Sequence, residues 1–473
     1  MNATSYSRLS YVAIKVETTE NTAVTPDTFV PFMSEDIVTE YQPTPAMPVS
    51  ANRTKNLRPV KVAIPAPTGN ISLLLEPRTI GHFLRGIFGT VTSGRYAAIS
   101  GVTGTFQVGE TITGGSSSAT ATVIAVSDQA NYLLIGTPTG TFTDGETITG
   151  GTSSASATLA QVDTSVYGHE FKAPQSSLPT FTVEFGYANE AIRYTGVRFN
   201  ALNSVGQSDN IVTAENGVIA RGEFKHAKVT AITTSGAGSK TITVDQTTGL
   251  VAGDSVKVWR EGTGFLDFSA ASVKTHTIDS ITSETAFVVT NLETSLAVGD
   301  RIVIAPQTPS YSISNEFFWI GGSVAKVAAT ADALIAASAT CIEDFELNLT
   351  NEIEPRHCAT GINFINRFPS NNYLKGIEAG GRINKTYGDI NLLTKLRDNT
   401  AQAIGIKHTG GEIGTTGQYY SLDWVWPNVQ YNNFNPSISE DALLEQEVEF
   451  TGFYSSSDGY LAKAVLVNDV TSY

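Results

Sequence analysis

The stretch GTFQVGETITGGSSSATATV, residues 104–123, returns at 140–159 as GTFTDGETITGGTSSASATL, with fifteen of twenty positions identical at an offset of 36. The copies contain no His, Cys, Lys or Arg, and one or two acidic residues each. Such a segment has almost none of the groups that catalysis uses, and its repetition indicates architecture. Each copy predicts a turn, a short TIT strand, a Gly-Gly-Ser/Thr loop and a second strand. One such hairpin cannot bury a face alone, so we expect the two copies to pack together.

The composition favours a β-rich chain with many turns. Of 473 residues 42 are Gly and only 16% are charged, while 41% hydrophobic residues are enough to build a core. The formal net charge of −15 argues against a surface that grips phosphates, which needs clustered Lys and Arg. The same charge would repel DNA and lipid headgroups and keep the protein in solution.

The cysteines and the hydropathy indicate a protein made in the cytoplasm. Cys341 and Cys358 form no CxxC motif, and two thiols cannot make a disulfide framework. The first twenty residues lack the basic start and apolar stretch of a signal peptide. The most apolar long segment, 324–342, is mostly alanine and contains Lys326 and Asp332, so it is a poor membrane span.

The rest of the chain alternates between strand patterns and two helical patterns. YVAIKVE at 11–17 and DFELNLT at 344–350 alternate as half-buried strands do. Ile80, Phe83, Leu84 and Ile87 recur at helical spacing between Pro77 and Gly89. Two further stretches suggest helices, namely INLLTKLRDNTAQAIG at 390–405 and, more weakly, the Ala-rich 324–340. The Pro-rich connection at 33–59 is too long for an ordinary turn, and loops of this length are commonly functional or mobile.

A second insertion contains a weaker internal repeat. ITVDQTTGLVAGDSVKV at 242–258 matches VVTNLETSLAVGDRIVI at 288–304, and both copies place Gly-Asp just before an apolar strand. We therefore predict an all-β fold, a β-sandwich or barrel core with one or two short helices, and two small inserted β domains. The predicted boundaries are core at 1–97, 167–227 and 310–473, the twin-repeat domain at 98–166, and a β-barrel or sandwich at 228–309.

The sequence contains no motif that indicates a catalytic, cofactor-binding or metal site. His357 and Cys358 with the distant Cys341 are the one conceivable zinc cluster, and it lacks an obvious fourth ligand. Glu352 and Glu354 would share one face of a strand about 7 Å apart, as a glycosidase pair could, but nothing else supports that chemistry. The Asp-Gly-Glu at 144–146 offers too few oxygens for calcium, and the Gly-rich pieces lack the phosphate-loop pattern.

The order of these elements resembles that of bacteriophage major tail tube proteins. The resemblance covers roughly 1–90, 167–227 and 310–473, and it lies in element order and sequence style rather than in one invariant motif. The segments that carry it are YVAIKVETTENTAVTPDTFVPFMSEDI (11–37), GNISLLLEPRTIGHFLRGIFG (69–89), FTVEFGYANEAIRYTGVRFNALNS (181–204), CIEDFELNLTNEIEP (341–355), GGRINKTYGDINLLTKLRDNTAQAIGIKH (380–408), EVEFTGFY (447–454) and LAKAVLVND (461–469).

The resemblance implies a subunit that partners itself in a ring, usually a hexamer, and rings that stack into a virion tail tube for genome ejection. It also implies tape measure, tail terminator and tail tip proteins as partners, and DNA that passes without specific binding. An acidic surplus would suit such a lumen. The 33–59 loop and the chain after 454 become candidates for docking between rings, and the repeats would project outward as decoration.

Other interpretations stay open at this point. A head decoration or head–tail joining protein would use repeated β modules equally well. A carbohydrate-binding adhesin would need exposed aromatic residues, whereas the repeats contribute only Phe106 and Phe142, each of which we expect to be buried in its own copy of the unit. An enzyme lacks support from the residues.

Overall fold

The computed structural model describes residues 10–40, 44–46, 58–60, 64–127, 131–207, 211–266, 275–312, 316–319, 321–358, 368–386, 391–433, 435–437 and 445–473. The chain is all-β, as predicted, and its described residues include two α-helices, α1 (Ile80–Phe88) and α2 (Asn391–Arg397). No helix within these ranges has the length and hydropathy needed to cross a membrane.

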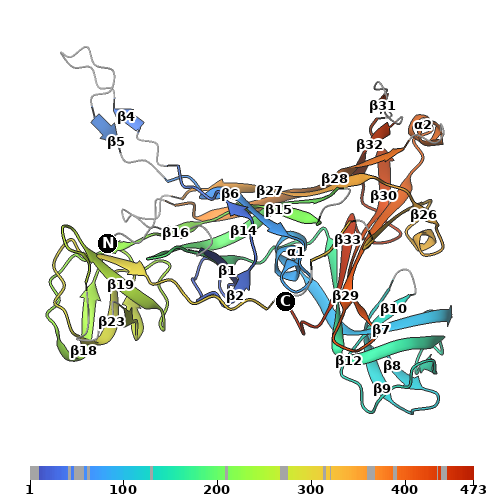
Figure 1. The fold of residues 1–473 in the computed structure, drawn as a ribbon, viewed down its shortest axis with the longest axis horizontal. Helices are drawn as coiled ribbons and strands as arrows, with labels where there is room; N and C mark the ends of the chain where they lie inside the picture. Colours follow the sequence, from blue (N-terminus) through green and yellow to red (C-terminus); the bar gives the residue numbers. More distant parts are fainter. Residues whose placement is uncertain are drawn as a thin grey trace.

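One antiparallel sheet, which we call the wide sheet, runs across the upper part of the molecule in Figure 1. Its strands follow one another in space in the order β3 (Ser34–Glu35), β6 (Thr68–Leu74), β15 (Thr213–Ile219), β14 (Ala191–Gly206), β27 (Asp344–Arg356), β28 (Asn371–Thr386), β32 (Glu445–Gly452) and β31 (Asn435–Ser437). Strands far apart in the chain are therefore neighbours.

A second sheet meets the wide sheet at a corner, where β30 pairs with both β32 and β33. Its order is β26 (Ala339–Thr340), β25 (Ser323–Ala328), β29 (Gln402–Glu412), β30 (Tyr419–Tyr431), β33 (Ala462–Asn468), β12 (Ser156–Ala173) and β7 (Val91–Thr103). A smaller sheet of β2 (Thr28–Val30), β1 (Tyr11–Val16), β13 (Phe181–Gly186), the start of β14 and β16 (Gly222–Phe224) completes the core.

The core lies between these sheets because each contributes its apolar face to a single cluster. Leu347 and Leu349 of β27 face inward from the wide sheet, and Trp424 and Trp426 of β30 face inward from the second sheet. Both tryptophans are almost completely buried. Burial of large apolar side chains of this kind supplies the main driving force for the fold.

Helix α1 fills the angle between the sheets, as the spacing of its apolar residues predicts (Figure 1). The backbone amide of Ile80 donates to the carbonyl of Glu76, so Pro77 lies inside the first turn. The buried Glu76 carboxylate accepts the backbone amide of Thr79 at 2.8 Å, which satisfies a free amide at the positive end of the helix. Gly89 ends the helix with φ +95°.

The twin repeat forms a closed six-stranded barrel at the lower right of Figure 1. Its pairings run around a complete circle, β7 to β10 (Tyr132–Ile135), β9 (Thr120–Val126), β8 (Thr111–Gly114), β11 (Thr147–Gly150), β12 and back to β7. Phe106 and Phe142 are buried, as predicted, but they share one cluster that both copies build instead of lying each in its own unit. Closure also removes every free strand edge from the barrel.

The barrel has a pseudo-two-fold axis that the register locates. Ala97 pairs with Leu133 and Thr113 pairs with Thr149, and each pair joins positions 36 residues apart, the offset of the repeat. Equivalent positions of the two copies therefore face each other. Strands β7 and β12 continue past the barrel into the second sheet, so the boundaries predicted at 98 and 166 fall inside these two strands.

The second insertion packs two sheets around a separate cluster at the lower left of Figure 1. One sheet contains β18 (Gly236–Thr243), β23 (Ala286–Leu292) and β22 (Ser280–Ser283). The other contains β17 (Ala227–Lys228), β24 (Arg301–Ile304), β19 (Ser255–Arg260), β20 (Gly264–Phe265) and β21 (His276–Thr277). We call this unit the second module.

The two insertions contain four turns of the same type, two in each insertion. Gly109, Gly145, Gly253 and Gly299 have φ between +81° and +102°, a conformation that favours glycine. In each turn the next residue is acidic, and its carboxylate accepts the backbone amide three positions earlier at 2.6 to 2.8 Å. The glycine amide donates to a facing carbonyl, and that facing residue's amide donates back to the acid's carbonyl. The Gly-Asp and Gly-Glu patterns thus mark turns that dock on a neighbouring strand.

A buried charge network joins the second module to the core. The Arg193 guanidinium, on β14, donates to Glu184 of β13 at 2.6 Å and to Asp254 of the module at 2.6 Å. Tyr11 also donates to Glu184, at 2.6 Å. Because Arg193, Glu184 and Asp254 are almost wholly buried, each charge depends on its partners. Buried ion pairs therefore fix the second module against the core, in addition to the chain segments that connect the two.

Two predicted helices are wrong in whole or in part. Helix α2 ends at Arg397, Asn399 adopts φ +51°, and β29 begins at Gln402, so 390–405 is not one helix. The Ala-rich 324–340 forms β25, a short 3₁₀ helix η2 (Asp332–Leu334) and β26. The residues of β25 alternate between the two faces of the sheet, as a strand requires, because Ala325 faces the core while its neighbours face outward.

The predicted 33–59 connection is partly described. It begins with β3 and continues to β4 (Thr44–Ala46), which pairs with β5 (Arg58–Val60) in a ribbon that stands away from the body at the upper left of Figure 1. The remainder of that connection, 41–43 and 47–57, lies outside the described residues.

Candidate functional site

The outward face of the wide sheet is mostly polar, and we call it the polar face. Side chains alternate between the sheet's two faces, so the residues between the core positions point away from it. In β27 the core positions Phe345 and Leu347 alternate with Glu346 and Asn348. Directly opposite residues of neighbouring strands share a face, so the register extends the polar face from strand to strand.

Three rows of residues define the polar face from β6 to β32. The rows are Asn70, Gly217, Ala201, Thr350 and Glu378; then Ser72, Glu215, Asn203, Asn348, Gly380 and Thr451; then Leu74, Thr213, Val205, Glu346, Arg382 and Glu449. Small and polar residues predominate, with neither a large aromatic nor a cysteine in these rows. Such a face offers little to a tight ligand.

The charge of the polar face is acidic. Its rows contain Glu215, Glu346, Glu378 and Glu449 against a single base, Arg382. Arg382 lies 3.0 Å from Glu447, 3.6 Å from Glu346 and 3.7 Å from Asp344, so acids surround its charge. Partial burial lowers the pKa of Arg382, but these carboxylates outweigh that effect and raise it. The face as a whole would repel a polyanion.

The wide sheet ends at open edges. Within the described residues β3 pairs only with β6, and β31 pairs only with β32. Beside β3 the side chains of Met33 and Val38 are exposed by 60% and 53%. An edge with exposed apolar side chains is a template for another chain.

The candidates for metal and hydrolytic chemistry do not assemble into a site. Cys341 and Cys358 are exposed, and no group of three or more potential ligands occurs in the part of the chain that the structure describes. Glu352 and Glu354 form ion pairs with Lys375 at 3.1 and 2.8 Å. The bond to Lys375 lowers the pKa of Glu354, so this carboxylate is a poor proton donor.

The acid of the Asp-Gly-Glu motif has a structural role. The Glu146 carboxylate accepts the backbone amides of Ser116 and Ser117 at 3.0 Å and the Ser117 hydroxyl at 2.7 Å. A Cβ at Gly114 would lie 2.6 Å from the same carboxylate, which explains the glycine of the TITG strand. The donors occupy the oxygens that calcium would need.

The chain after 454 is not a free docking tail, contrary to our expectation. Strand β33 is buried along its whole length between β12 and β30, and the Tyr473 hydroxyl donates to the Arg78 carbonyl at 2.9 Å beside α1. Exposed residues lie at its two ends, at Ser456 and Ser457 and again at Thr471 and Ser472, and the preceding Phe453 and Tyr454 are exposed by 42% and 55%. The reason is physical, since a run of apolar residues such as 464–467 is stable inside the core.

Sequence reasoning missed the polar face as a site. Its signal was present as alternation in β27, but the sequence does not indicate which strands lie side by side. Glu215 and Glu346 come from distant parts of the chain and meet through β14.

No family model matches this chain, and no curated protein matches it either.

Proposed function

We propose that this protein is the repeating subunit of a bacteriophage tail tube, with the polar face lining the bore. One observation carries the proposal, namely an acid-rich face without binding features that extends without a break across a sheet with open edges. Sheets that continue from copy to copy around an axis would give a closed wall. Passing DNA would be repelled by that wall and would not adhere.

The resemblance of element order supplies the rest of the proposal. It suggests rings of six copies that stack, a tape measure protein inside, and terminator and tip proteins at the ends of the tube. The two inserted modules would then be decoration outside the wall. The site of action would be the virion tail.

The first test is assembly. We expect purified protein, alone or seeded with tail tips, to form rings or tubes with a central hole in negative-stain micrographs. A protein that remains monomeric at high concentration under both conditions would contradict the proposal. A protein that binds preformed capsids without polymerising would instead support a head decoration protein.

A second test asks which face lines the bore. Glu215, Glu378 and Glu449 are exposed on the polar face, and we would replace all three with Lys. Assembled rings of this variant should retain short duplex DNA, with retention falling steeply as salt rises. The matched control replaces Glu261, Glu284 and Glu293, exposed on the second module. Equal DNA retention by the two variants would show that the polar face does not line the bore.

A further inference from the structure

A pocket of about 410 Å³ opens between the second module and the core. Its floor is the face of the module's sheet of β17, β24, β19 and β20 that points away from the module's own apolar cluster. One wall is the turn between β13 and β14, with Asn189 and Glu190, and the other is the turn between β16 and β17, with Lys225 and His226. The volume lies within the range of about 300–1,000 Å³ that small-molecule sites occupy.

Two aromatic side chains form the apolar part of this pocket. Trp259 on β19 pairs directly with Phe265 of β20, and both are partly exposed. Neither belongs to the module's apolar cluster, whereas Val256 and Val258 of β19 do. Aromatic rings of this kind offer a ligand a flat apolar surface, and their replacement removes nothing from the core.

The guanidinium of Arg301 lies over the Trp259 ring, 5.2 Å from the ring centroid, because the two residues are directly opposite in the register of β19 and β24. Stacking on the ring holds the planar guanidinium in one orientation. Within the described part of the chain no hydrogen bond or ion pair engages its donors, and the residue is exposed. An oriented guanidinium with open donors suits a carboxylate, which it can bind through two parallel hydrogen bonds.

The other cations around the pocket are already bound within the protein. The Lys225 ammonium pairs with the buried Glu223 at 2.9 Å. The Lys257 ammonium, on β19, donates to the Asn189 carbonyl at 3.0 Å and so ties the floor to one wall. The pocket is therefore formed before a ligand arrives, which reduces the cost of binding.

Two groups suited to hydroxyls lie near the guanidinium. Burial lowers the pKa of His226, and the charge of Arg301 lowers it further, so the imidazole is neutral at pH 7 and offers one donor and one acceptor. Glu190 acts on the same pKa in the opposite sense, which indicates that its carboxylate is near the ring. This carboxylate is exposed and can accept hydrogen bonds from hydroxyls.

We propose that this pocket binds an acidic saccharide, a sugar ring that carries a carboxylate. The C–H face of the ring would pack against Trp259 and Phe265, and the carboxylate would accept from Arg301. The sugar hydroxyls would meet Glu190 and His226. A small inorganic anion would leave the aromatic surface unused, and a neutral sugar would leave the guanidinium unused.

The charge and the place of the pocket argue against nucleic acid as the ligand. Single strands also stack on aromatic rings, but their backbone needs a groove of cations, whereas this chain carries −15. In Figure 1 the second module lies on the same side of the wide sheet as α1, opposite the polar face. The inference goes beyond the proposed function and does not depend on it, because a single chain contains the whole pocket.

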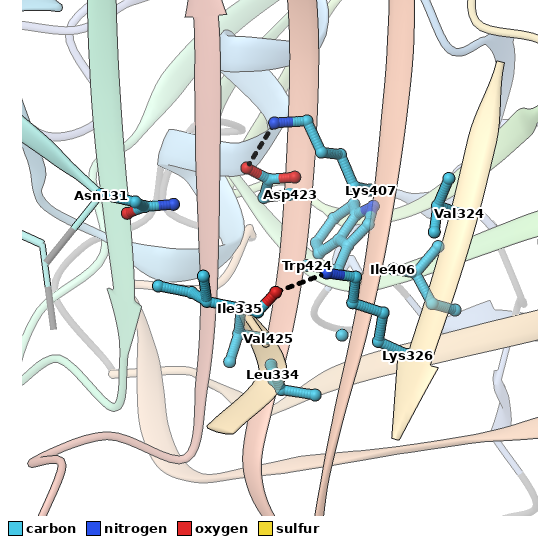
Figure 2. A pocket seen from close by; sticks show the side chains of 11 residues that line it. Asn131, Val324, Lys326, Leu334, Ile335, Ile406, Lys407, Asp423, Trp424 and Val425 are labelled. Atoms are coloured by element: carbon cyan, nitrogen blue, oxygen red, sulfur yellow. Dashed lines mark hydrogen bonds and ion pairs between the residues drawn. The ribbon is translucent and has the colours of Figure 1, made fainter. Parts of the chain in front are cut away.

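A cleft on the outer face of the second sheet, beside the barrel, offers a ligand less (Figure 2). Its volume is about 350 Å³. The Lys326 ammonium donates to the Ile335 carbonyl at 2.9 Å, and the Lys407 ammonium lies 3.5 Å from the Asp423 carboxylate. Its charged groups are therefore engaged with the protein itself, and the ring of Trp424 belongs to the core.

Tryptophan fluorescence of the full chain tests binding directly. Trp319, Trp424 and Trp426 are buried, so a change on ligand addition reports on Trp259. The probes are a short oligogalacturonate, a short oligomannuronate and sialyllactose, which are acidic saccharides of different stereochemistry. We expect saturable binding of at least one of them. Its methyl ester, the same saccharide without the charge, should bind at least about tenfold more weakly, because a hydrogen bond to a charged group is lost.

Two variants of the full chain assign the contacts, with calorimetry as the readout because one of them removes the fluorophore. Trp259→Ala should weaken binding about tenfold, since it removes the aromatic surface. Arg301→Gln should bind the acid no better than its methyl ester, a change of preference that a structural defect would not produce. Tyr373→Ala and Arg356→Gln, exposed on the wide sheet, are the matched controls and should bind as the wild type does. Circular dichroism and thermal unfolding check that every variant is folded.

Three outcomes would overturn the inference. The first is that none of the probes binds, or that the acid and its ester bind equally well. The second is wild-type binding by folded Trp259→Ala, or an undiminished preference for the acid in folded Arg301→Gln. The third is tighter binding of a short oligothymidylate than of every saccharide, which would indicate a site for single-stranded nucleic acid. Rings formed by the wild type would leave the proposed function standing in each case.

Discussion

Glu110 and Glu146 hold the same position in the two copies of the repeat, and each carboxylate is bound by the loop of the other copy. Glu110 accepts the Ser153 backbone amide at 2.9 Å, and Glu146 accepts the Ser117 backbone amide at 3.0 Å. Serine hydroxyls add bonds of 2.8 and 2.7 Å to the same carboxylates. Neither copy can therefore complete its own loop, and this exchange explains why the sequence contains the unit twice.

Replacing either glutamate with Gln should destabilise the barrel. The amide NH₂ would face donors instead of accepting from them, and each lost bond to a charged acceptor costs roughly 1.5–3 kcal/mol. Glu110→Gln and Glu146→Gln should lower the barrel's stability by similar amounts, because their surroundings match. Hydrogen exchange of the barrel amides measures the effect. Asp144→Asn, exposed next to Glu146, is the control, and an equal loss there would contradict the explanation.

The barrel should also lose stability in acid. Burial would raise the pKa of Glu110 and Glu146, but hydrogen bonds from the serines of the opposite loop, together with a backbone amide of the glutamate's own turn, outweigh it and hold each pKa at about 2. A pKa below the ordinary 4.5 means that the stabilisation is complete above pH 4.5 and disappears as the pH falls toward 2. Urea unfolding of the barrel at several pH values below 5 measures this loss. The two Gln variants should show a weaker dependence.

Replacing Arg193 should reduce the stability of the fold far more than replacing Arg260, which occupies the equivalent position beside the other Gly-Asp turn. Each binds the aspartate of a Gly-Asp turn, Asp254 and Asp300 respectively, but the Arg193 side chain is 1% exposed and that of Arg260 33%. Arg193→Met strands two buried carboxylates, and we expect a loss of 3–5 kcal/mol of stability. Arg260→Met should cost about 1–2 kcal/mol, since water reaches that site. Thermal unfolding of both variants measures the two losses of stability. Equal losses would contradict the role of Arg193 in holding the second module to the core.

Gly81 and Tyr473 should behave as a coupled pair. A Cβ at Gly81 would lie 2.1 Å from the Tyr473 ring, so Gly81→Ala must displace that ring, at a cost of roughly 1–3 kcal/mol. Once Tyr473→Ala has removed the ring, the same change on α1 should cost little. A double-mutant cycle by chemical unfolding measures the coupling, and additive effects would show that the contact carries no energy.

Removing the repeat should leave assembly intact. The polar face of the wide sheet contains no barrel residue. A chain with 98–165 replaced by a short turn should therefore still form rings by electron microscopy, at a lower melting temperature. Loss of rings from a folded deletion variant would place the barrel in the wall.

The sequence predicted what local pattern determines. The helix at Ile80–Phe88, the strand at Asp344–Arg356 and the packing of the two repeats all follow from residues close together in the chain. The composition of the Ala-rich 324–340 favours a helix, because alanine fits a helix well, but pairing with β29 makes 323–328 a strand.

The candidate surfaces required the tertiary fold. Lys326 was visible in the sequence only as a charge that interrupts an apolar segment, and nothing there places it across from Asp423. The cleft that Asn131, Lys326 and Asp423 line joins residues separated by almost three hundred positions in the chain. The polar face likewise depends on strand order, since alternation assigns a residue to a face but not to a neighbour.

The continuous strands β7 and β12 have a mechanical consequence. The same two strands pair inside the barrel and again, at 91–95 with 167–171, at the core. A pull along them would load all these backbone hydrogen bonds in shear at once, instead of opening them one by one. A barrel mounted in this way resists detachment from the core under force. In single-molecule pulling, we expect the barrel to rupture before the pairing of 91–95 with 167–171 does.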